Sequence, residues 1–448
     1  MSDSTLHDWY YGYMRQVKKL LKKLIPAFLF KRLLPAFHTF QAMFYSAIFG
    51  FPAKKLKVIA VTGTNGKTTT VSYIVSILEA AGYKVGAATT SYSKIGNKII
   101  HNKENRTVAD PIKVFWLLRR MRWSRVDWVV LEVTSHSLEQ NRLLGVPIEA
   151  AVITNLTQDH LDYHKTIENY AAAKAKLFEK DVKFNALNAD DEWHDYYAKI
   201  PTQHKMSYGT DAKSNARITS VKLTPKFSTF TIKLDHTVKL DFKTDLIGKF
   251  NIYNATAAIT ITYMLYIDKS AIVKGIKNMQ TVPGRMEPIK ADIPYSLIID
   301  FAHTPDGLEN VLETLKNLTK NRLIVVFGGT GNRNEERPIM GEIAAKYADR
   351  IILTDDEPYD KDPAELRAHV MEGIKAGKGV GKTTEVAGRK NGIKKALDIA
   401  KKDDTVVLTG MGDYDFMKVG DDYIPWSDKG AVLEILEEKG LTEPPVQQ

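Results

Sequence analysis

A glycine-rich stretch, VTGTNGKTTT at residues 61–70, has the residue types that bind the phosphates of a nucleotide. It follows the pattern G-x-x-x-x-G-K-[ST], except that a valine stands at the first glycine. Gly63 and Gly66 let the backbone approach anionic oxygens, because they carry no side chain that would block them. Lys67 can reach the β- and γ-phosphates, and Thr68 can offer its hydroxyl to Mg²⁺. The stretch therefore predicts a site for ATP and Mg²⁺.

Two further polar residues follow apolar segments that have the composition of buried strands. Glu132 lies near the end of DWVVLEV (127–133), and His160 follows AAVITNL (150–156). A carboxylate in such a place is costly unless it is paired or binds a metal. Because neighbouring parallel strands end at one edge of a sheet, both side chains should face the same crevice as the phosphate loop. They are candidate supports for the Mg²⁺.

The elements that position these residues alternate between strand and helix. KVIAVT (57–62) reads as a strand that leads through the loop into a helix, and alternating apolar residues in 205–245 predict a small antiparallel part. A second alternating series follows VPGRMEP (282–288). We expect an α/β fold: a P-loop central domain with a parallel sheet at 56–285, a Rossmann-like C-terminal domain at 286–448, and a short helical segment at 1–55.

Composition excludes several classes of site. The chain of 448 residues has no cysteine, which excludes disulfides, thiolate-bound zinc, iron–sulfur clusters and a thiol nucleophile. The net charge is +10, but residues 1–60 hold ten Lys or Arg and two acidic residues, so the rest of the chain is nearly neutral. The charge therefore belongs to the N-terminal segment, and we expect no nucleic-acid partner.

The N-terminal segment allows three readings. Apolar residues between Val17 and Leu24 recur at helical spacing among four lysines, which indicates a basic amphipathic helix that ends at Pro26. Residues 33–53 contain no charged side chain. The segment could lie on an anionic membrane surface, span a membrane, or pack as a helical cap on the next domain.

Seven motifs occur in the order seen in the Mur ligases. They are GTNGKTTT (63–70), LEVTSHSLEQNR (131–142), TNLTQDHLDYHKTIENYAAAKAKLF (154–178), GKFNIYNATAA (248–258), PGRME (283–287), DFAHTPDGL (300–308) and ERPIM (336–340). From about Leu56 to about Leu436 the chain resembles this family, and most of all its MurE branch, which adds an amino acid to a muramoyl-dipeptide. The family's short loop also accounts for the missing first glycine.

The resemblance implies an ATP-dependent amide ligase of cell-wall peptide synthesis that works through an acyl phosphate. It implies ATP contacts from Gly63, Thr64, Asn65, Gly66, Lys67, Thr68, Thr69, Asn254, Arg285, Asp300 and His303. It assigns catalysis to Lys67, Glu132, His160 and Lys174, with two Mg²⁺ ions supported by Thr68, Glu132, His160 and Lys174. Lys174 matches a lysine that the family carries as a carbamate, which requires a lowered pKa, since only a neutral amine reacts with CO₂.

The resemblance also implies sites for the two substrates. The acceptor, a UDP-muramoyl-peptide or a related molecule, would contact Asn105, Thr107, Thr134, Gln140 and Arg142. The free amino acid would contact Arg333, Asp356, Glu357, Tyr359, Gly410 and Tyr414. Chains that select diaminopimelate carry an arginine where this one has Tyr359. The nearby acids Asp356, Glu357 and Asp413 suit an ammonium, so we expect lysine or ornithine in place of diaminopimelate.

The start of the chain departs from the family pattern. MurE proteins carry a folded uridine-nucleotide domain before the loop, and here fewer than 63 residues precede Gly63. The acceptor could therefore be lipid-linked or a pseudomurein-type peptide. Folylpolyglutamate-like polyglutamylation is another reaction of related Mur-fold ligases. A nucleotide-gated scaffold protein is the alternative that is not an enzyme. We expect a monomer in the cytoplasm, with peripheral membrane contact through residues 1–55.

Overall fold

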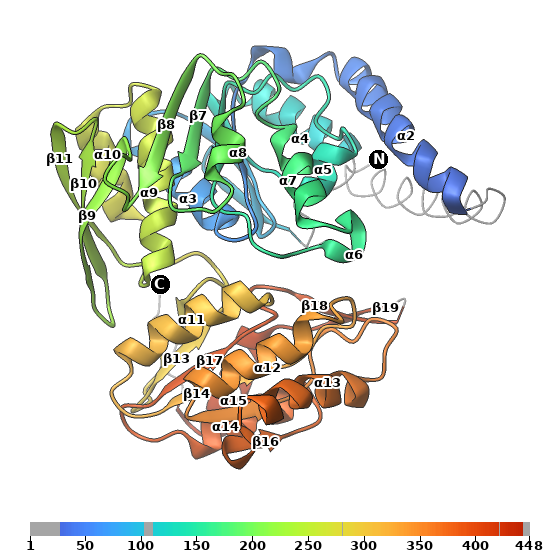
Figure 1. Ribbon diagram of the computed structural model, residues 1–448, viewed down its shortest axis with the longest axis vertical. Helices are drawn as coiled ribbons and strands as arrows, with labels where there is room; N and C mark the ends of the chain where they lie inside the picture. Colours follow the sequence, from blue (N-terminus) through green and yellow to red (C-terminus); the bar gives the residue numbers. More distant parts are fainter. Residues whose placement is uncertain (1–26, 103–110, 280, 421, 442–448) are drawn as a thin grey trace.

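Two sheets organise the chain, and each is covered by helices on both faces (Figure 1). The computed structural model describes residues 27–102, 111–279, 281–420 and 422–441. The basic helix predicted near residues 17–24 lies outside these ranges. Within them, no helix is long and apolar enough to span a membrane.

The larger sheet has eleven strands, of which β8, β7, β6, β1, β5 and β2 run parallel to one another. At one end the antiparallel pairs β9–β10 and β10–β11 extend it, which is the antiparallel part that the alternating sequence predicted. At the other end β3 and β4 form a hairpin that the sequence did not indicate. The strand order is β11 (Val238–Thr244), β10 (Ser228–Leu234), β9 (Ala216–Leu223), β8 (His204–Gly209), β7 (Phe184–Asn188), β6 (Ala150–Ile153), β1 (Lys57–Thr62), β5 (Trp128–Glu132), β2 (Val85–Ala88), β3 (Tyr92–Ile95) and β4 (Lys98–His101).

Alternation along β1 divides the core of this sheet into two layers. Ile59 and Val61 pack on one face, and Val58 and Ala60 pack on the other. The first layer is covered by α3 (Lys67–Ala80), α9 (Lys249–Met264) and α10 (Lys269–Asn278). The second is covered by α2 (Ala27–Ile48), η1 (Pro52–Lys55), α4 (Pro111–Trp123), α5 (Ser135–Glu139), α7 (Ile167–Ala175) and α8 (His194–Ala198), and α6 (Leu161–His164) packs on α7.

The smaller sheet begins just after Arg285 and is parallel except for its first strand. Its order is β12 (Glu287–Pro288), β13 (Ser296–Ile299), β17 (Thr405–Leu408), β14 (Leu323–Phe327), β15 (Arg350–Leu353) and β16 (Thr383–Glu385). One face packs on α11 (Pro305–Leu318), α12 (Glu336–Tyr347) and α13 (Pro363–Ala376), and the other on α14 (Arg389–Ile399) and α15 (Asp428–Glu438). This half of the molecule also contains a separate two-stranded hairpin, formed by β18 (Phe416–Val419) and β19 (Asp422–Pro425), and the 3₁₀ turn η2 (Val380–Lys382). The predicted α/β class is confirmed.

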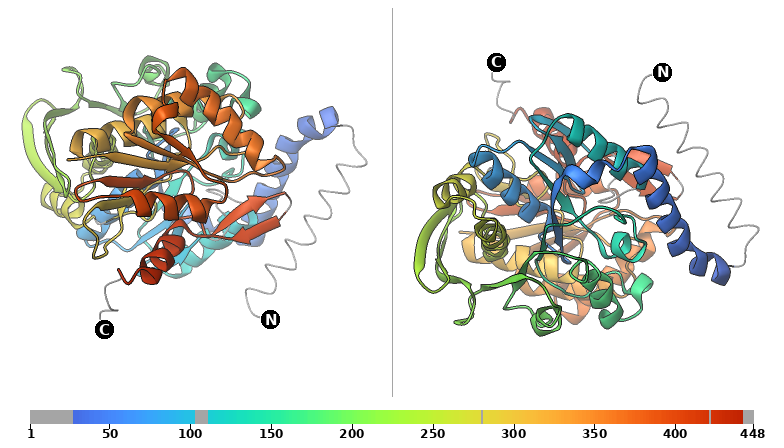
Figure 2. Two further views of the ribbon diagram at one scale, coloured as in Figure 1. Left: turned by 90° about the horizontal axis from the view of Figure 1, so that it is seen from below. Right: turned by 90° about the horizontal axis from the view of Figure 1, so that it is seen from above.

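Strand register brings the predicted site residues to one edge of the larger sheet. Val61 of β1 is paired with Glu132 of β5, and Thr62 is paired with Ile153 of β6. The loop at residues 63–66 therefore leaves the sheet beside Glu132 and the segment that follows β6. The smaller sheet and its helices lie below this edge in Figure 1, and the views of Figure 2 show the same stacking from below and above.

Candidate functional site

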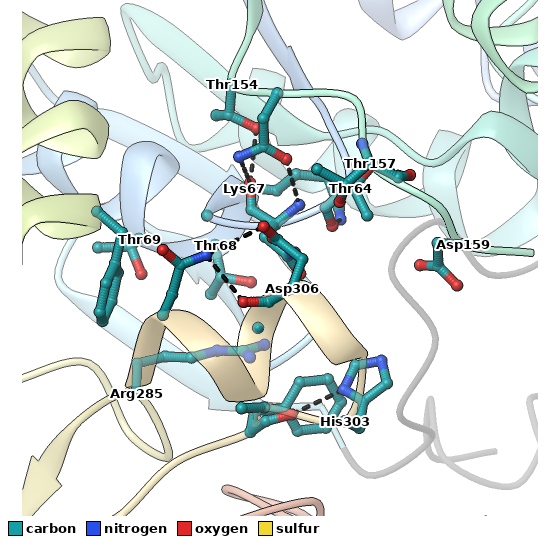
Figure 3. Close-up of a pocket in the computed structure, with 18 of the residues that line it drawn as sticks. Thr64, Lys67, Thr68, Thr69, Thr154, Thr157, Asp159, Arg285, His303 and Asp306 are labelled. Atoms are coloured by element: carbon teal, nitrogen blue, oxygen red, sulfur yellow. Dashed lines mark hydrogen bonds between the residues drawn. The ribbon is translucent and has the colours of Figure 1, made fainter. Parts of the chain in front are cut away.

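A cavity of about 760 Å³ lies where the two sheets face each other. The larger sheet contributes the glycine-rich loop and the segments after β5 and β6, and the smaller one contributes the N-terminal part of α11 and the loops after β14 and β15. Figure 3 shows Lys67, Thr68, Arg285 and Asp306 around the central space, with Asp159 and His303 to one side. The size suits a nucleotide or a similarly large ligand.

The two glycines of the loop are required by close approach and by backbone angle. Gly63 has φ +146°, and a Cβ built there would lie 1.8 Å from Thr154 Oγ1. Gly66 has φ +80°, and its Cβ would lie 2.1 Å from Asn254 Oδ1. Asn254, on α9, thus backs the loop, and its Oδ1 accepts a hydrogen bond from Thr70 Oγ1 at 3.4 Å. Lys67, Thr68 and Thr69, at the start of α3, line the cavity, and the N-terminus of a helix favours an anion.

Lys67 turns its ammonium back onto its own loop. Its Nζ donates to Thr64 O at 2.7 Å. Burial lowers the pKa of Lys67, and the carboxylates of Glu132 and Asp159 oppose that shift. Phosphate oxygens in the cavity would add to this opposition and keep the ammonium charged, since an anion stabilises the protonated form.

Glu132 is the centre of a small buried oxygen group. It accepts hydrogen bonds from Thr68 Oγ1 at 2.8 Å, and from the backbone N and the hydroxyl of Thr90, each at 2.9 Å. Thr90 follows β2, and no sequence signal pointed to it. Among the described residues no three His, Asp or Glu side chains are arranged around a common metal position. Thr68 and Glu132 would hold Mg²⁺ together with phosphate oxygens and water, which is the shell that this ion prefers.

Lys174 is fully buried on α7, behind the glycine-rich loop. Its Nζ donates to Gly63 O at 2.8 Å and lies 4.3 Å from the centre of the Tyr170 ring. Burial lowers the pKa of Lys174 well below its ordinary value, and the charge of Lys67 adds to the shift. A neutral amine is what carbamate formation requires, so the residue fits the modification that the resemblance implies. Lys176, two residues further on, is exposed.

His160 and Asp159 form a polar group that reaches across the cavity. His160 adopts the left-handed φ of 54° and lies 3.5 Å from Asp159 through its Nε2. Burial lowers the pKa of His160 to about 3 despite the charge of Asp159, so its imidazole is neutral at pH 7. Arg333 donates to Asp159 Oδ1 and to Glu336 Oε2, both at 2.8 Å. Burial alone would raise the pKa of Asp159, but Arg333 holds it below its ordinary value. Arg333, expected to clamp the amino acid, is here engaged by two carboxylates.

Arg285 enters the cavity from the start of the smaller-sheet half. Its guanidinium stacks 4.1 Å from the centre of the Phe301 ring, and its Nε is buried without a hydrogen-bond partner among the described residues. A buried donor without a partner is uncommon and fits an absent anionic ligand. Asp300 instead accepts the backbone N–H groups of Met286 and Ala302, both at 2.7 Å. The carboxylate of Asp300 therefore holds the chain that carries Arg285.

His303 and Asp306 follow on the same segment. His303 places Nδ1 2.7 Å from Phe301 O, so this nitrogen carries a proton and donates it. Burial lowers the pKa of His303 to about 3. Asp306, at the start of α11, accepts from Asn65 Nδ2 at 2.6 Å, which joins the glycine-rich loop to the other half of the molecule. No sequence pattern indicated this contact.

The residues predicted for the acceptor are only partly described. Thr134 caps α5 through a hydrogen bond from Ser137 N, and Gln140 Oε1 accepts from Arg142 Nε and Nη2 at 3.1 and 2.8 Å. Thr134 and Arg142 line the cavity, whereas Gln140 lies behind Arg142. Asn105 and Thr107 lie outside the described residues.

The residues predicted for the amino acid divide into two groups. Arg333, Glu357, Tyr359, Gly410 and Tyr414 line the cavity. Asp356 does not; it lies 3.8 Å from Arg389 and accepts the backbone N–H of Glu357.

Two charged groups stand close to this part of the cavity. Burial, helped by the charge of Asp356, raises the pKa of Glu357 to about 7. Lys418, on β18, places its Nζ 4.9 Å from the centre of the Tyr359 ring. Sequence reasoning did not include Lys418, because the β18–β19 hairpin that carries it gave no recognisable signal.

Comparisons with known proteins identify the family. Residues 61–262 match the Mur ligase middle domain, and residues 284–412 match the Mur ligase glutamate ligase domain. A UDP-N-acetylmuramoyl-L-alanyl-D-glutamate–2,6-diaminopimelate ligase of Aquifex aeolicus is 41% identical over 390 residues, which cover 87% of this chain and 79% of the relative. The chain belongs to the Mur ligase family. Mur ligases use ATP and Mg²⁺, in agreement with the loop and oxygen group described above.

Other relatives of this Mur ligase give the same result. Ligase 1 of the same name from Clostridium acetobutylicum is 38% identical over 390 residues, covering 86% of this chain and 79% of the relative. The solved structure of a UDP-N-acetylmuramoyl-L-alanyl-D-glutamate–2,6-diaminopimelate ligase superposes with a TM-score of 0.62 at 30% identity, covering 91% of this chain and 83% of that one. Both halves of the molecule thus share the family fold.

Proposed function

We propose that this Mur ligase joins an amino acid to a muramoyl-dipeptide acceptor, at the expense of ATP, in cell-wall peptide synthesis. The observation that carries the proposal is the convergence of three groups on one cavity: the ammonium of Lys67, the Thr68–Glu132 oxygen pair, and the Arg285 guanidinium whose Nε has no partner among the described residues. Such a set neutralises a triphosphate from three sides.

The reaction consists of two transfers. A carboxylate oxygen of the acceptor attacks the γ-phosphorus, the bond to the β–γ bridging oxygen breaks, and ADP leaves with that electron pair. The amine of the incoming amino acid then attacks the acyl carbon, and the tetrahedral species expels phosphate and leaves an amide. Lys67 and Arg285 stabilise charge on the moving phosphoryl group, and Mg²⁺ supplies further neutralisation when it is bound.

The remaining sites are proposed on the same basis. Lys174 carries a carbamate next to Gly63 O, and His160, neutral at pH 7, supports a second Mg²⁺. Arg142 gives up its hydrogen bonds to Gln140 Oε1 and binds an anionic group of the acceptor bidentately instead. We place the division between the two catalytic domains at Arg285, close to residue 284, where the match to the second family description begins. The reaction takes place in the cytoplasm, where ATP and nucleotide-linked precursors are found.

For the amino acid, we retain lysine or ornithine as the proposal. The relatives are named as 2,6-diaminopimelate ligases, and this favours diaminopimelate instead. Against it, Tyr359 offers no charge to a distal carboxylate, and Glu357 lines the cavity with an acidic group. Because the pKa of Glu357 is about 7, its negative charge and hence its affinity for an ammonium increase as the pH rises through neutrality.

The test is a panel of acceptors and amino acids with mass detection of the product. The full chain is incubated with ATP, Mg²⁺, UDP-muramoyl-dipeptide and lysine, ornithine or diaminopimelate. Phosphate release that requires both acceptor and amino acid, together with an amide product, supports the ligase. Phosphate release that neither substrate affects would refute it.

Two variants examine the choice of amino acid. Glu357→Gln should lower kcat/KM for lysine by about tenfold, because it removes one charge-assisted contact to the side-chain ammonium. Tyr359→Arg should raise kcat/KM for diaminopimelate by a similar factor. A wild-type preference for diaminopimelate would overturn the lysine or ornithine assignment while leaving the ligase proposal intact.

A further inference from the structure

Helix α2 and the residues that follow it expose five large apolar side chains on the outside of the molecule. Phe40, Met43, Phe44 and Ile48 recur at helical spacing, and Phe51 follows the helix end. These five side chains, called the apolar ridge here, are between 46% and 64% exposed. Phe40 and Phe44 stack on each other with ring centres 5.9 Å apart. A row of exposed apolar residues of this size is unusual on a protein that contacts only water.

The inner face of the same helix mixes apolar and polar side chains. Ala42 and Tyr45 belong to the core, while His38, Gln41 and Ser46 are each 4% exposed, and His38 Nδ1 lies 3.0 Å from Gln41 Oε1. A surface helix normally turns its apolar stripe to the core and its polar face to solvent. Over residues 36–48, α2 instead has apolar side chains on both faces, and three of its polar side chains are buried. The outer side of the helix therefore favours an apolar environment.

Basic side chains, called the positive rim here, lie around the C-terminal end of the apolar ridge. Lys54 and Lys55 are exposed on η1, and Lys54 Nζ lies 4.5 Å from the Phe51 ring centre. Arg119, on α4, stacks on Trp123 at 4.3 Å, and Arg122 Nη1 donates to Gly50 O at 3.1 Å. The sequences of α2, η1 and α4 contain no Asp or Glu. Every charged group on these three packed elements is therefore a cation.

We propose that α2 docks this protein on an anionic lipid surface, lying in the membrane plane with the apolar ridge at the boundary of headgroups and acyl chains. The positive rim then faces the headgroup phosphates, each Lys or Arg adding attraction. Trp123, 68% exposed beside Arg119, suits the interfacial region. A second copy of the chain fits less well, because a two-fold contact between ridges would bring the cationic rims together. The inference rests on α2 and is independent of the proposed ligase reaction.

The test is sedimentation of the full chain with vesicles. Wild-type protein should bind vesicles that contain phosphatidylglycerol, and should bind pure phosphatidylcholine vesicles at least tenfold more weakly. The variant Phe40→Gln, Phe44→Gln, Ile48→Gln should lose about a hundredfold in affinity, since three half-exposed apolar side chains no longer enter the bilayer. The matched control changes three exposed apolar residues elsewhere, Val221→Gln, Tyr266→Gln and Val380→Gln, and should bind as the wild type does.

Further measurements distinguish a lipid surface from other partners of the apolar ridge. Lys54→Gln with Lys55→Gln should weaken binding to anionic vesicles about tenfold or more and leave binding to neutral ones unchanged. Both ridge and charge variants should keep wild-type melting temperatures and phosphate release with soluble substrates. Vesicle binding that the ridge variant retains in full would overturn the proposal and assign binding to residues 1–26. A dimeric mass in solution that the ridge variant abolishes, without vesicle binding by the wild type, would overturn it in favour of a second copy.

Discussion

Replacement of Lys174 by methionine should make the protein more stable and inactive at the same time. Lys174 is 1% exposed, its Nζ contacts Gly63 O, and its pKa is lowered well below the ordinary value, mainly by burial. The folded protein therefore binds a proton on this amine more weakly than the unfolded chain does. Methionine has a similar length and no charge to lose, so it removes this opposing contribution to folding.

The magnitude follows from proton linkage. At pH 7 the unfolded chain carries a proton on this amine, and each pH unit by which the fold lowers the pKa costs about 1.4 kcal/mol of folding free energy. The hydrogen bond to Gly63 O, which the variant loses, returns about 1 kcal/mol. Because the pKa is lowered well below its ordinary value, Lys174→Met should raise the free energy of unfolding at pH 7, by about 1 kcal/mol or more. Because the unfolded state binds more protons, wild-type stability rises with pH, and the advantage of the variant should shrink as the pH is raised, by at most about 1.4 kcal/mol per unit.

Urea unfolding at pH 7, 8 and 9 in buffers freed of carbon dioxide measures this difference. Lys176→Met is the matched control, because Lys176 is exposed on the same helix region and its replacement should give a small, pH-independent change. Added bicarbonate should stabilise the wild type through carbamate formation in the folded state alone, and should leave Lys174→Met unaffected. The variant should show no amide synthesis under any of these conditions.

Two results would refute the reasoning. A Lys174→Met protein less stable than the wild type at pH 7 would mean that the amine is charged and compensated in the fold. A stability difference that is the same at pH 7 and pH 9 would mean that no proton is released on folding. Either outcome would remove the basis for a carbamate at this position.

Three further predictions concern the loop, the cation position and the smaller sheet. Binding of Mg-ATP should raise the free energy of unfolding of the wild type by about 2.7 kcal/mol at one hundred times the dissociation constant, and Glu132→Gln should abolish most of this increase. Thermal unfolding with and without Mg-ATP measures the difference. Gly63→Ala should abolish ATP binding in calorimetry, because its Cβ would lie 1.8 Å from Thr154 Oγ1 at φ +146°; wild-type affinity would contradict this. Arg389→Met should destabilise the protein by about 3–5 kcal/mol in urea, since it strands the buried Asp428, its partner at 2.6 Å; a loss below 1 kcal/mol would contradict this.

The parts of the site that the sequence predicted are those that strand topology alone brings together. A loop after β1 and a carboxylate at the end of β5 must meet if the strands are parallel neighbours, and Val61 is paired with Glu132. The glycine spacing predicted a phosphate-binding loop because such a loop is formed by a few consecutive residues. Such features are local, or follow from a regular sheet, and need no knowledge of side-chain packing.

The remaining features arise from contacts between distant segments. Thr90 reaches Glu132 across 42 positions, and Asn65 reaches Asp306 across 241, and neither pairing has a spacing that a sequence displays. Helix α2 is instructive for the opposite reason. Its sequence left three readings open, and only three-dimensional contacts show that Ala42 and Tyr45 are covered while Phe40 and Phe44 are exposed.

Polar contacts join the two halves across the cavity, in addition to the apolar packing of Ile247 and Phe250 on the core of the smaller-sheet half, and the polar contacts affect how the site opens. Arg333 bridges to Asp159 of the other half, but it also keeps Glu336 on its own side at 2.8 Å. Separation of the halves therefore leaves the arginine paired, and the free energy lost is that of one ion pair and not of a stranded cation. Asn65 and Asp306 regain water when they part. A triphosphate between the halves would add anionic partners for Arg285, whose Nε has none among the described residues. Nucleotide binding and closure should therefore favour each other.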